Sequence, residues 1–433
     1  MNISPKNFVR IYLTLFTLSI YTYRFGEVLD RATVQYLTVS IVNFLTIISI
    51  PLFFKNLNLK KLIKDPLLIS YFGYLLMAIL SLLVALNKVE SLVRINQLFT
   101  FLLSLGIFIF FLQRNLIQLK DILWLSAITL VIDMSFSLEQ YVFMILNEIP
   151  YRYEYITNLV GLHGNRNILA TVILFRIPLL IILAKKLNKN IFYFISFLIG
   201  SIAFFNIILL SSRAAFLSIG VCVIFLVLIS SYRYFYTRKN ILRQNMHIIL
   251  LFILPFFLAF QISNYVIDKN DNSYFTNRVQ TIVGSDDESK NTRIRYYSQA
   301  IYHIVKNPLL GGGIGNWKIY SIGYDSKNIQ NYIVPYNAHN DILEATAETG
   351  LLGGIFFLSF FIILFLKLSH FFKKIIEPDD DYQFYSLLFL PYIIYIIDLN
   401  LNFPSHRPIN LYMLLLFICI IYLNSPKLIS ETK

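Results

Sequence analysis

The stretch YNAHNDILEATAETGLLGGIFFLSFFIILFLKL, residues 336–368, joins a group of polar side chains directly to a long apolar run. The run occupies residues 351–368, and Lys367 is its one charged residue. A helix needs about 20 residues of this kind to cross the hydrocarbon core of a bilayer, which is about 30 Å thick. This stretch therefore predicts a membrane-spanning helix with polar residues at its start.

Apolar runs of similar length recur from one end of the chain to the other. Hydrophobic residues make up 57% of the 433 residues, and the mean hydropathy is +0.64. We predict twelve spans, at residues 10–23, 34–54, 66–86, 96–113, 122–146, 168–184, 191–210, 214–231, 247–264, 351–368, 384–399 and 408–424. Because lipid offers the backbone no hydrogen-bond partners, the predicted fold is all-α, a polytopic transmembrane helical bundle.

One long polar segment interrupts this series between the ninth and tenth spans. We expect residues 1–264 to hold spans one to nine, residues 265–340 to form one large, partly helical loop, and residues 341–433 to hold spans ten to twelve. The two cysteines, Cys222 and Cys419, lie inside apolar runs, so we expect no disulfide framework.

The distribution of Lys and Arg predicts how the spans are oriented. The first apolar run follows a basic lead and has no small-residue cleavage site after it, so we interpret it as an uncleaved span. If the amino terminus is cytoplasmic, the inner loops, such as KNLNLKKLIK (55–64) and AKKLNK (184–189), are richer in Lys and Arg than the outer ones. We therefore expect both termini in the cytoplasm and the large loop outside. The net charge of +13 then mostly reflects the Lys and Arg residues of the cytoplasmic loops, which orient the spans. We therefore expect no nucleic-acid partner.

The predicted topology places several basic residues on the outer side, at the ends of spans or in the large loop. They are His163, Arg166, Arg213, Arg293, Arg295, His339 and Arg407. A single arginine near the end of a span can extend its charged group to the membrane surface without binding a ligand. Several on one face favour another interpretation, because a guanidinium group can bind phosphate oxygens through two parallel hydrogen bonds. We infer an anionic, phosphate-bearing, lipid-linked ligand.

The polar segment before the tenth span has the pattern of a helix start. Asp341 and Glu344 have the spacing of a capping box, with Asp341 as the cap and Glu344 reaching back. Asn340, Glu344 and Glu348 are four residues apart and would form one polar stripe. The alternative is that Glu344 and Glu348 are ordinary solvated surface.

His339 would lie just outside this helix start, at the membrane surface. A lone histidine is more often structural than catalytic. At a lipid interface beside arginines, however, its charged form would be disfavoured, which would hold it neutral near pH 7. His339 is therefore a candidate proton acceptor.

Glycines mark two further features of this part of the chain. GGGIG, residues 311–315, lacks the Lys-Ser/Thr and the βαβ context of a phosphate-binding loop, so we interpret it as a flexible turn that lets the large loop fold back. Gly350 and Gly354 form a small-residue pair that would let another helix approach closely.

These segments resemble the superfamily of O-antigen ligases and polymerases. His339-Asn340, nine residues, Gly350, two residues and Gly353 reproduce its H-N-x9-G-x-x-G signature, at the end of the large periplasmic loop. GNRNILA (164–170), SSRAAFLSIGV (211–221) and TRIRYYSQAIYHIVKNPLLGGGIGNW (292–317) are similar to other family segments. The resemblance covers roughly residues 160–360, and Tyr297 stands where the family commonly has tryptophan.

The resemblance implies an inverting, metal-independent glycosyltransferase without a cofactor, in the inner membrane of a bacterium. It would take a glycan from undecaprenyl pyrophosphate at the periplasmic face and join it to an acceptor hydroxyl. Arg213 and Arg293 match the family's arginines and would neutralise the departing pyrophosphate, while His339 would receive the acceptor's proton. The second-rank candidates for substrate binding are Arg166, Asn340, Arg295, His163 and Arg407.

The acceptor is left open by the sequence. The compact signature favours a ligase that uses the lipid A core, and the alternative is a polymerase that uses a second lipid-linked glycan. A protein hydroxyl is a further possible acceptor within the superfamily. A transporter without chemistry would also have many spans, but its polar residues would cluster near the midplane, and no Gly- or Pro-broken spans mark two matched halves here.

Overall fold

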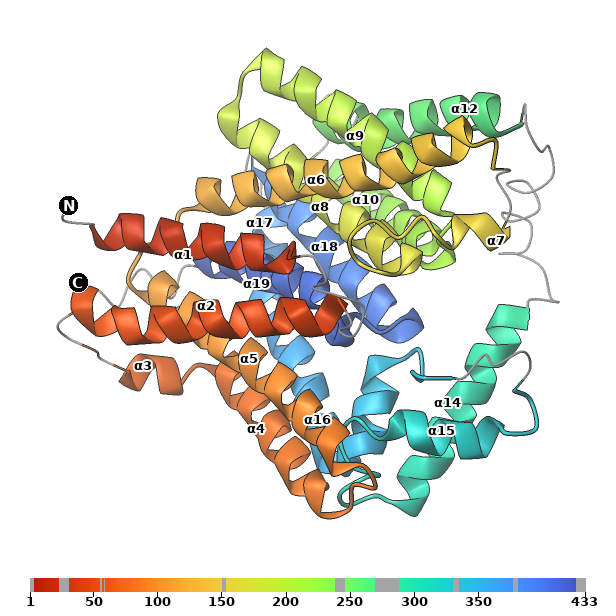
Figure 1. The fold of residues 1–433 in the computed structure, drawn as a ribbon. Helices are drawn as coiled ribbons and strands as arrows, with labels where there is room; N and C mark the ends of the chain where they lie inside the picture. Colours follow the sequence, from red (N-terminus) through yellow and green to blue (C-terminus); the bar gives the residue numbers. More distant parts are fainter. Residues whose placement is uncertain are drawn as a thin grey trace. The chain divides into compact units, whose positions relative to one another are not determined.

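Helices form the regular structure of the chain in the computed structural model (Figure 1). The structure describes residues 4–22, 31–54, 57, 59–149, 153–237, 246–268, 288–329, 335–376 and 381–425. Within these ranges every regular element is a helix and no strand occurs. The predicted all-α class is therefore confirmed.

Ten helices in the described ranges are long and apolar enough to cross a membrane. They involve α2 (Arg31–Phe53), α4 (Pro66–Leu80) with η1 (Ser81–Leu83), α5 (Lys88–Gln113), α6 (Leu119–Leu146), α8 (Arg166–Leu187), α9 (Asn190–Leu210), α10 (Arg213–Thr237), η2 (Ile249–Ile253) with α12 (Leu254–Asp268), α16 (Asp341–Ser369) with α17 (Phe372–Ile376), and α18 (Tyr382–Leu401). The chain is accordingly a multi-pass membrane protein by the length and composition of its helices.

The first and last predicted spans also coincide with helices, but these are shorter. Helix α1 (Pro5–Ile20) has 16 residues and α19 (Pro408–Asn424) has 17. Each of the twelve predicted runs therefore coincides with a helix over most of its described residues, whereas ten of them satisfy the length and apolarity needed for a crossing. The number of twelve crossings stays a prediction.

The shorter helices include those of the predicted large loop. In its described part, the segment from residue 288 to residue 340 contains α14 (Glu288–Lys306) and α15 (Trp317–Asp325), and its assignment as one large loop stays a prediction. Residues 269–287 and 330–334 of that loop lie outside the described ranges. The remaining short elements are α3 (Lys60–Ile63), α7 (Tyr153–Ile156) and η3 (Pro404–His406).

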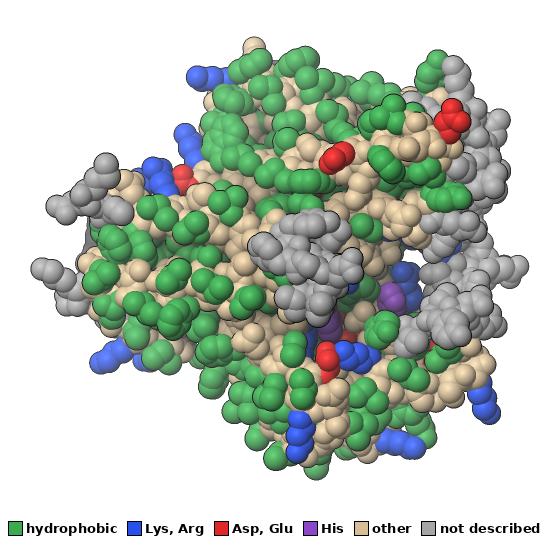
Figure 2. All heavy atoms as spheres, viewed as in Figure 1, with side chains coloured by type: hydrophobic (Ala, Val, Ile, Leu, Met, Phe, Trp, Pro, Cys, Tyr) green, Lys and Arg blue, Asp and Glu red, His purple; other side chains and the backbone are tan. Residues whose placement is uncertain are grey.

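Large apolar side chains cover much of the surface drawn in Figure 2. Among the large apolar residues of the described chain, Leu52 and Phe44 on α2 and Leu146 on α6 have most of their side chains exposed. Water would penalise such exposure, whereas lipid would not. By contrast, α8 is buried along almost its whole length, where it packs against α6 and α9.

The chain forms two compact units. The first unit comprises Met1–Ile117, Asp287–Lys367 and Leu399–Lys433, and the second comprises Gln118–Asp286 and Leu368–Asp398. The predicted site residues divide between them. The first unit holds Arg293, Arg295, His339, Asn340 and Arg407, and the second holds His163, Arg166 and Arg213.

Candidate functional site

Helix α16 begins where the sequence predicts, but another residue caps it. The Asn340 Oδ1 atom accepts hydrogen bonds from the second and third backbone N–H groups of the helix, at 3.1 and 3.0 Å. Asp341 instead accepts from the Ser405 N–H at 2.8 Å, and Glu344 accepts from the Ala338 N–H at 2.7 Å. The predicted cap at Asp341 is therefore wrong. Its carboxylate holds η3 against α16, and the residue before the helix takes the capping role.

Gly350 interrupts α16 after its first turns. Its backbone angles are non-helical, with φ 77° and ψ 177°. The next N–H group, on Leu351, donates to the Pro308 carbonyl at 2.8 Å instead of bonding within the helix. A loop backbone thus occupies the space beside Gly350, so the prediction that this glycine admits a neighbouring helix is wrong.

The glycine-rich stretch 311–315 docks onto the first part of α16. The N–H groups of Gly312 and Gly313 donate to the Ala347 and Glu348 carbonyls, at 2.9 and 3.0 Å. Residues 311–314 are buried, and a Cβ atom on Gly311 would lie 2.4 Å from the Ala347 carbonyl oxygen. The loop does fold back, as predicted, but it is a tightly packed turn and not a flexible one.

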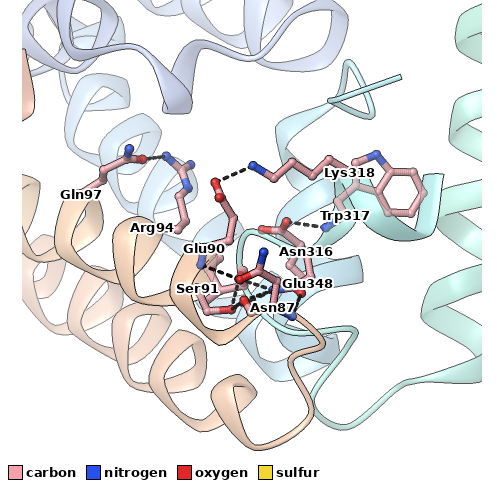
Figure 3. Close-up of polar contacts among 10 residues, drawn as sticks. Asn87, Glu90, Ser91, Arg94, Gln97, Asn316, Trp317, Lys318 and Glu348 are labelled. Carbon is pink, nitrogen blue, oxygen red and sulfur yellow. Dashed lines mark hydrogen bonds and ion pairs between the residues drawn. The ribbon is translucent and has the colours of Figure 1, made fainter. Parts of the chain in front are cut away.

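Buried side chains fasten this turn to α5 and α16 (Figure 3). The carboxylate of Glu348, 4% exposed, accepts a hydrogen bond from the Trp317 N–H at 2.9 Å. Asn316 accepts from the Asn87 N–H at 2.7 Å and donates to the Ser91 hydroxyl at 2.8 Å. The start of α15 is therefore fixed between the first turns of two apolar helices.

A cavity of about 710 Å³ lies beside this junction, within the first unit. Its charged lining residues are Glu90, Arg94, Lys318, Glu344, Glu348 and Arg407. The Arg94 guanidinium donates to Gln97 Oε1 at 2.9 Å, and Lys318 forms an ion pair with Glu90 at 2.5 Å (Figure 3). The lining thus combines equal numbers of cationic and carboxyl groups.

Glu344 is part of this lining and is only 2% exposed. Its second carboxyl oxygen lies 2.9 Å from His406 Nε2. Burial and the positive charge of Arg94 lower the pKa of His406 well below its usual value, so the neutral imidazole donates this hydrogen bond. The alternative that Glu344 and Glu348 are solvated surface is therefore wrong, because both are enclosed by partners from other segments.

His339 lies directly before the cap of α16, as predicted. Its imidazole is stacked with Tyr296 at 6.2 Å and lies edge-on to Phe403 at 5.5 Å between ring centroids. Burial and the nearby charge of Arg293 lower the pKa of His339 to about 4, and a hydrogen bond to the Leu401 backbone partly opposes them. The imidazole is therefore neutral at pH 7.

The tautomer of His339 follows from its hydrogen bonds. Nδ1 is buried and has no hydrogen-bond partner in the described part of the chain, so the bond to the Leu401 carbonyl comes from Nε2. Nε2 then carries the proton and Nδ1 a lone pair. A neutral imidazole with an unused lone pair can accept a proton.

Neighbouring polar groups fix the backbone around His339. The Tyr297 hydroxyl lies 3.1 Å from the His339 carbonyl oxygen and 2.6 Å from that of Asn400, both hydrogen-bond acceptors. The Asn340 amide donates to the Asn400 side chain at 3.2 Å. Tyr297, the residue that departs from the family pattern, thus ties α14 to both the end of α18 and the start of α16.

The three predicted arginines of the first unit differ in their surroundings. Arg293 lies close enough to His339 to lower its pKa. The guanidinium of Arg407 lies 5.4 Å from the Phe403 ring, and both residues line the cavity. Arg295 instead makes two hydrogen bonds to the Asp325 carboxylate, at 2.7 and 3.2 Å, which raise its pKa. Arg293 therefore lies near His339, Arg407 lies at the cavity beside Phe403, and Arg295 links α14 to α15.

The predicted residues of the second unit lie at helix starts and in a buried network. Arg213 and Arg166 are the first residues of α10 and α8. His163 is buried, with Nε2 2.8 Å from the Asp133 carboxylate, which also bonds Arg176. His163 thus supports the packing of α6 and α8, and its predicted role in substrate binding stays a prediction.

Sequence reasoning missed Arg94, Gln97, Lys318 and His406. Glu90, Arg94 and Gln97 are four and three residues apart, which places them on one face of α5. An arginine and a glutamine on one face near the start of an apolar helix were a usable signal. His406 stands next to Arg407 but has no pattern of its own, since its partner Glu344 is distant in the sequence.

Residues 197–358 match the model of a protein family described as O-antigen ligase. The match includes α10, α14, α15 and most of α16, with Arg213, Arg293, Arg295, His339 and Asn340. His163, Arg166 and Arg407 lie outside it. No curated protein matches the chain significantly.

Proposed function

This chain is a member of the O-antigen ligase superfamily by the match of residues 197–358, and we propose that it is a glycosyltransferase that uses a lipid-linked glycan. Membership supports a membrane glycan-processing enzyme in the broad sense. The donor, the acceptor and the residue roles below belong to the proposal.

The proposed donor is a glycan on undecaprenyl pyrophosphate. Its leaving group develops negative charge as the bond to the sugar breaks, and arginines stabilise such charge through paired hydrogen bonds. Arg213 is the first residue of α10, where the helix dipole also favours an anion. Arg293 lies beside His339. Each placement, within its own unit, supports that arginine as a group that can bind phosphate oxygens of the donor.

The proposed base is His339, and its neutral imidazole with an unpartnered Nδ1 beside Arg293 is the observation that carries the proposal. The acceptor oxygen forms a bond to the anomeric carbon, and its proton passes to Nδ1. The bond from that carbon to the phosphate oxygen breaks, and its electron pair leaves with undecaprenyl pyrophosphate. Attack opposite the leaving group inverts the anomeric centre.

The proposed location is the bacterial inner membrane, with both termini cytoplasmic and the site on the periplasmic face. The excess of Lys and Arg in alternate loops supports this orientation. Undecaprenyl-linked glycans and the surrounding membrane lipids are then the partners within reach of the site. No cofactor or metal takes part in the proposed chemistry.

The proposed acceptor is the lipid A core, and a second lipid-linked glycan is the alternative, since the superfamily contains both ligases and polymerases. The test incubates the purified protein and donor with and without lipid A core, in the presence of a chelator, and separates the products on a gel. Product that requires the core supports a ligase, and a ladder without it supports a polymerase. Intact donor under both conditions would contradict both and favour a protein acceptor or a transporter.

A further inference from the structure

The cavity beside the start of α16 is not used by the donor chemistry. It is bounded by α5, the loop before α15, the first turns of α16 and η3, all in the first unit. Its volume of about 710 Å³ lies in the range of small-molecule sites, about 300–1,000 Å³. The space is therefore large enough for one or two sugar rings.

The charges of the lining favour a hydroxyl-rich ligand over a phosphate. Arg94, Lys318 and Arg407 are matched by three carboxyl residues, of which Glu344 and Glu348 are buried. A phosphate would bring more negative charge next to these carboxyl groups, which is unfavourable at low dielectric. Sugar hydroxyls donate and accept hydrogen bonds, and so match both kinds of group.

Arg94 has a donor that the surrounding chain does not use. The residue is 6% exposed, and its terminal nitrogens bond Gln97 and, at 3.4 Å, Ser405. Its Nε atom is buried and lacks a partner in the described ranges. An unsatisfied buried donor is costly, so a bound hydroxyl oxygen would offset that cost.

Aromatic rings complete the lining. Tyr336 is 63% exposed, whereas Phe403 is buried, and both residues line the cavity. Apolar C–H faces of sugars pack on such rings. Phe403 also lies edge-on to His339, with ring centroids 5.5 Å apart. The cavity is thus one aromatic ring away from the proposed base.

We propose that this cavity is the acceptor subsite. It binds terminal sugars of the acceptor glycan through their hydroxyls, while the reacting hydroxyl of the same glycan extends past Phe403 to His339. The inference rests on the proposed glycosyl transfer and adds a binding role for Arg94, Gln97 and Tyr336. The ring of Tyr336 packs on a sugar face. The Arg94 and Gln97 side chains, which bond each other, hydrogen-bond its hydroxyls (Figure 3).

The first test compares initial rates while either acceptor or donor is varied. Tyr336→Ala and Gln97→Ala should each raise the KM for acceptor about tenfold and leave the KM for donor within about twofold, since a lost contact of about 1.4 kcal/mol is tenfold in affinity. Tyr336→Phe, which keeps the ring, should recover most of the loss. Asn96→Ala, an exposed amide on the same helix, is the matched control and should behave as wild type. An unchanged acceptor KM in both variants, or a rise in the donor KM instead, would overturn the proposal.

The second test measures binding without turnover. Core oligosaccharide freed of its lipid A is added to the detergent-purified full-length protein, and contact is followed by saturation-transfer NMR. Binding by wild type that weakens about tenfold in Tyr336→Ala supports the subsite even if transfer itself is never observed, which would count against the proposed function alone. Equal binding by wild type and Tyr336→Ala, or no binding by either, would overturn the subsite even if transfer is active.

Discussion

The carbonyl oxygen of Leu309 lies 2.2 Å from the position that a Cβ atom on Gly350 would occupy. Gly350 also adopts φ 77° and ψ 177°, a backbone conformation that is essentially confined to glycine. Gly350→Ala should therefore cost on the order of 3 kcal/mol, by strain and by displacement of the loop before α15. Thermal unfolding of the purified protein in detergent measures this loss.

The control for Gly350 is Gly323→Ala in α15. A Cβ atom on Gly323 would meet no heavy atom within 4 Å, and the residue is helical. Alanine is favoured over glycine there by about 0.5–1 kcal/mol. Equal melting temperatures for the two variants would contradict the assigned role of Gly350.

Arg213→Lys and Arg293→Lys test whether transfer needs the paired hydrogen-bond donors of the two guanidinium groups. Each keeps the positive charge but loses the planar pair of donors, so we expect the rate of glycan transfer to fall at least tenfold. Arg114→Lys at the far end of α5, where the guanidinium lies 4.5 Å from the Phe110 ring, is the control. Wild-type rates in both test variants would show that these arginines only anchor helices.

The hydropathy of the sequence was enough to predict the fold class, because each apolar run determines its own helix. It was also enough to place His339 before a helix, since that follows from neighbouring residues. The neutral state of His339 was expected from a lipid interface beside arginines, and in the structure it results from burial and from Arg293, 46 residues away. The cavity was not predictable in this way. Arg94 meets Ser405 across 311 residues, and Asn316 meets Asn87 across 229 residues. Such pairings depend on how the helices pack, which local patterns do not encode.

The same limit explains the errors at the start of α16. Glu344 and Glu348 have the spacing of a solvated stripe, and only the docking of His406 and of the loop before α15 buries them. The role of Gly350 likewise depends on Leu309, which approaches from another segment.

His339→Asn tests the proposed base. Asparagine tolerates the left-handed backbone of this residue, φ 56°, but cannot accept the acceptor's proton as imidazole does. Transfer should fall at least a hundredfold, while binding of undecaprenyl pyrophosphate should stay within about threefold of wild type. Measuring both on the same preparation separates the two effects, and retained turnover would remove His339 from the mechanism.

The pH dependence gives an independent test of His339, because its folded pKa of about 4 lies below the unfolded value of about 6.5. The neutral form is the proposed base, so kcat/KM should stay at its pH 7 value as the pH falls from 7 to 5 and should decrease through about pH 4.

The same pKa difference predicts how stability depends on pH. Between about pH 6.5 and pH 4 the unfolded chain takes up a proton at His339 that the folded chain does not. The stability contribution is therefore full above about pH 6.5 and falls on acidification through this window. The melting temperature of wild type relative to His339→Asn should accordingly decrease from pH 7 to pH 5. If kcat/KM instead falls with an apparent pKa near 6.5, burial and Arg293 do not lower the pKa of His339.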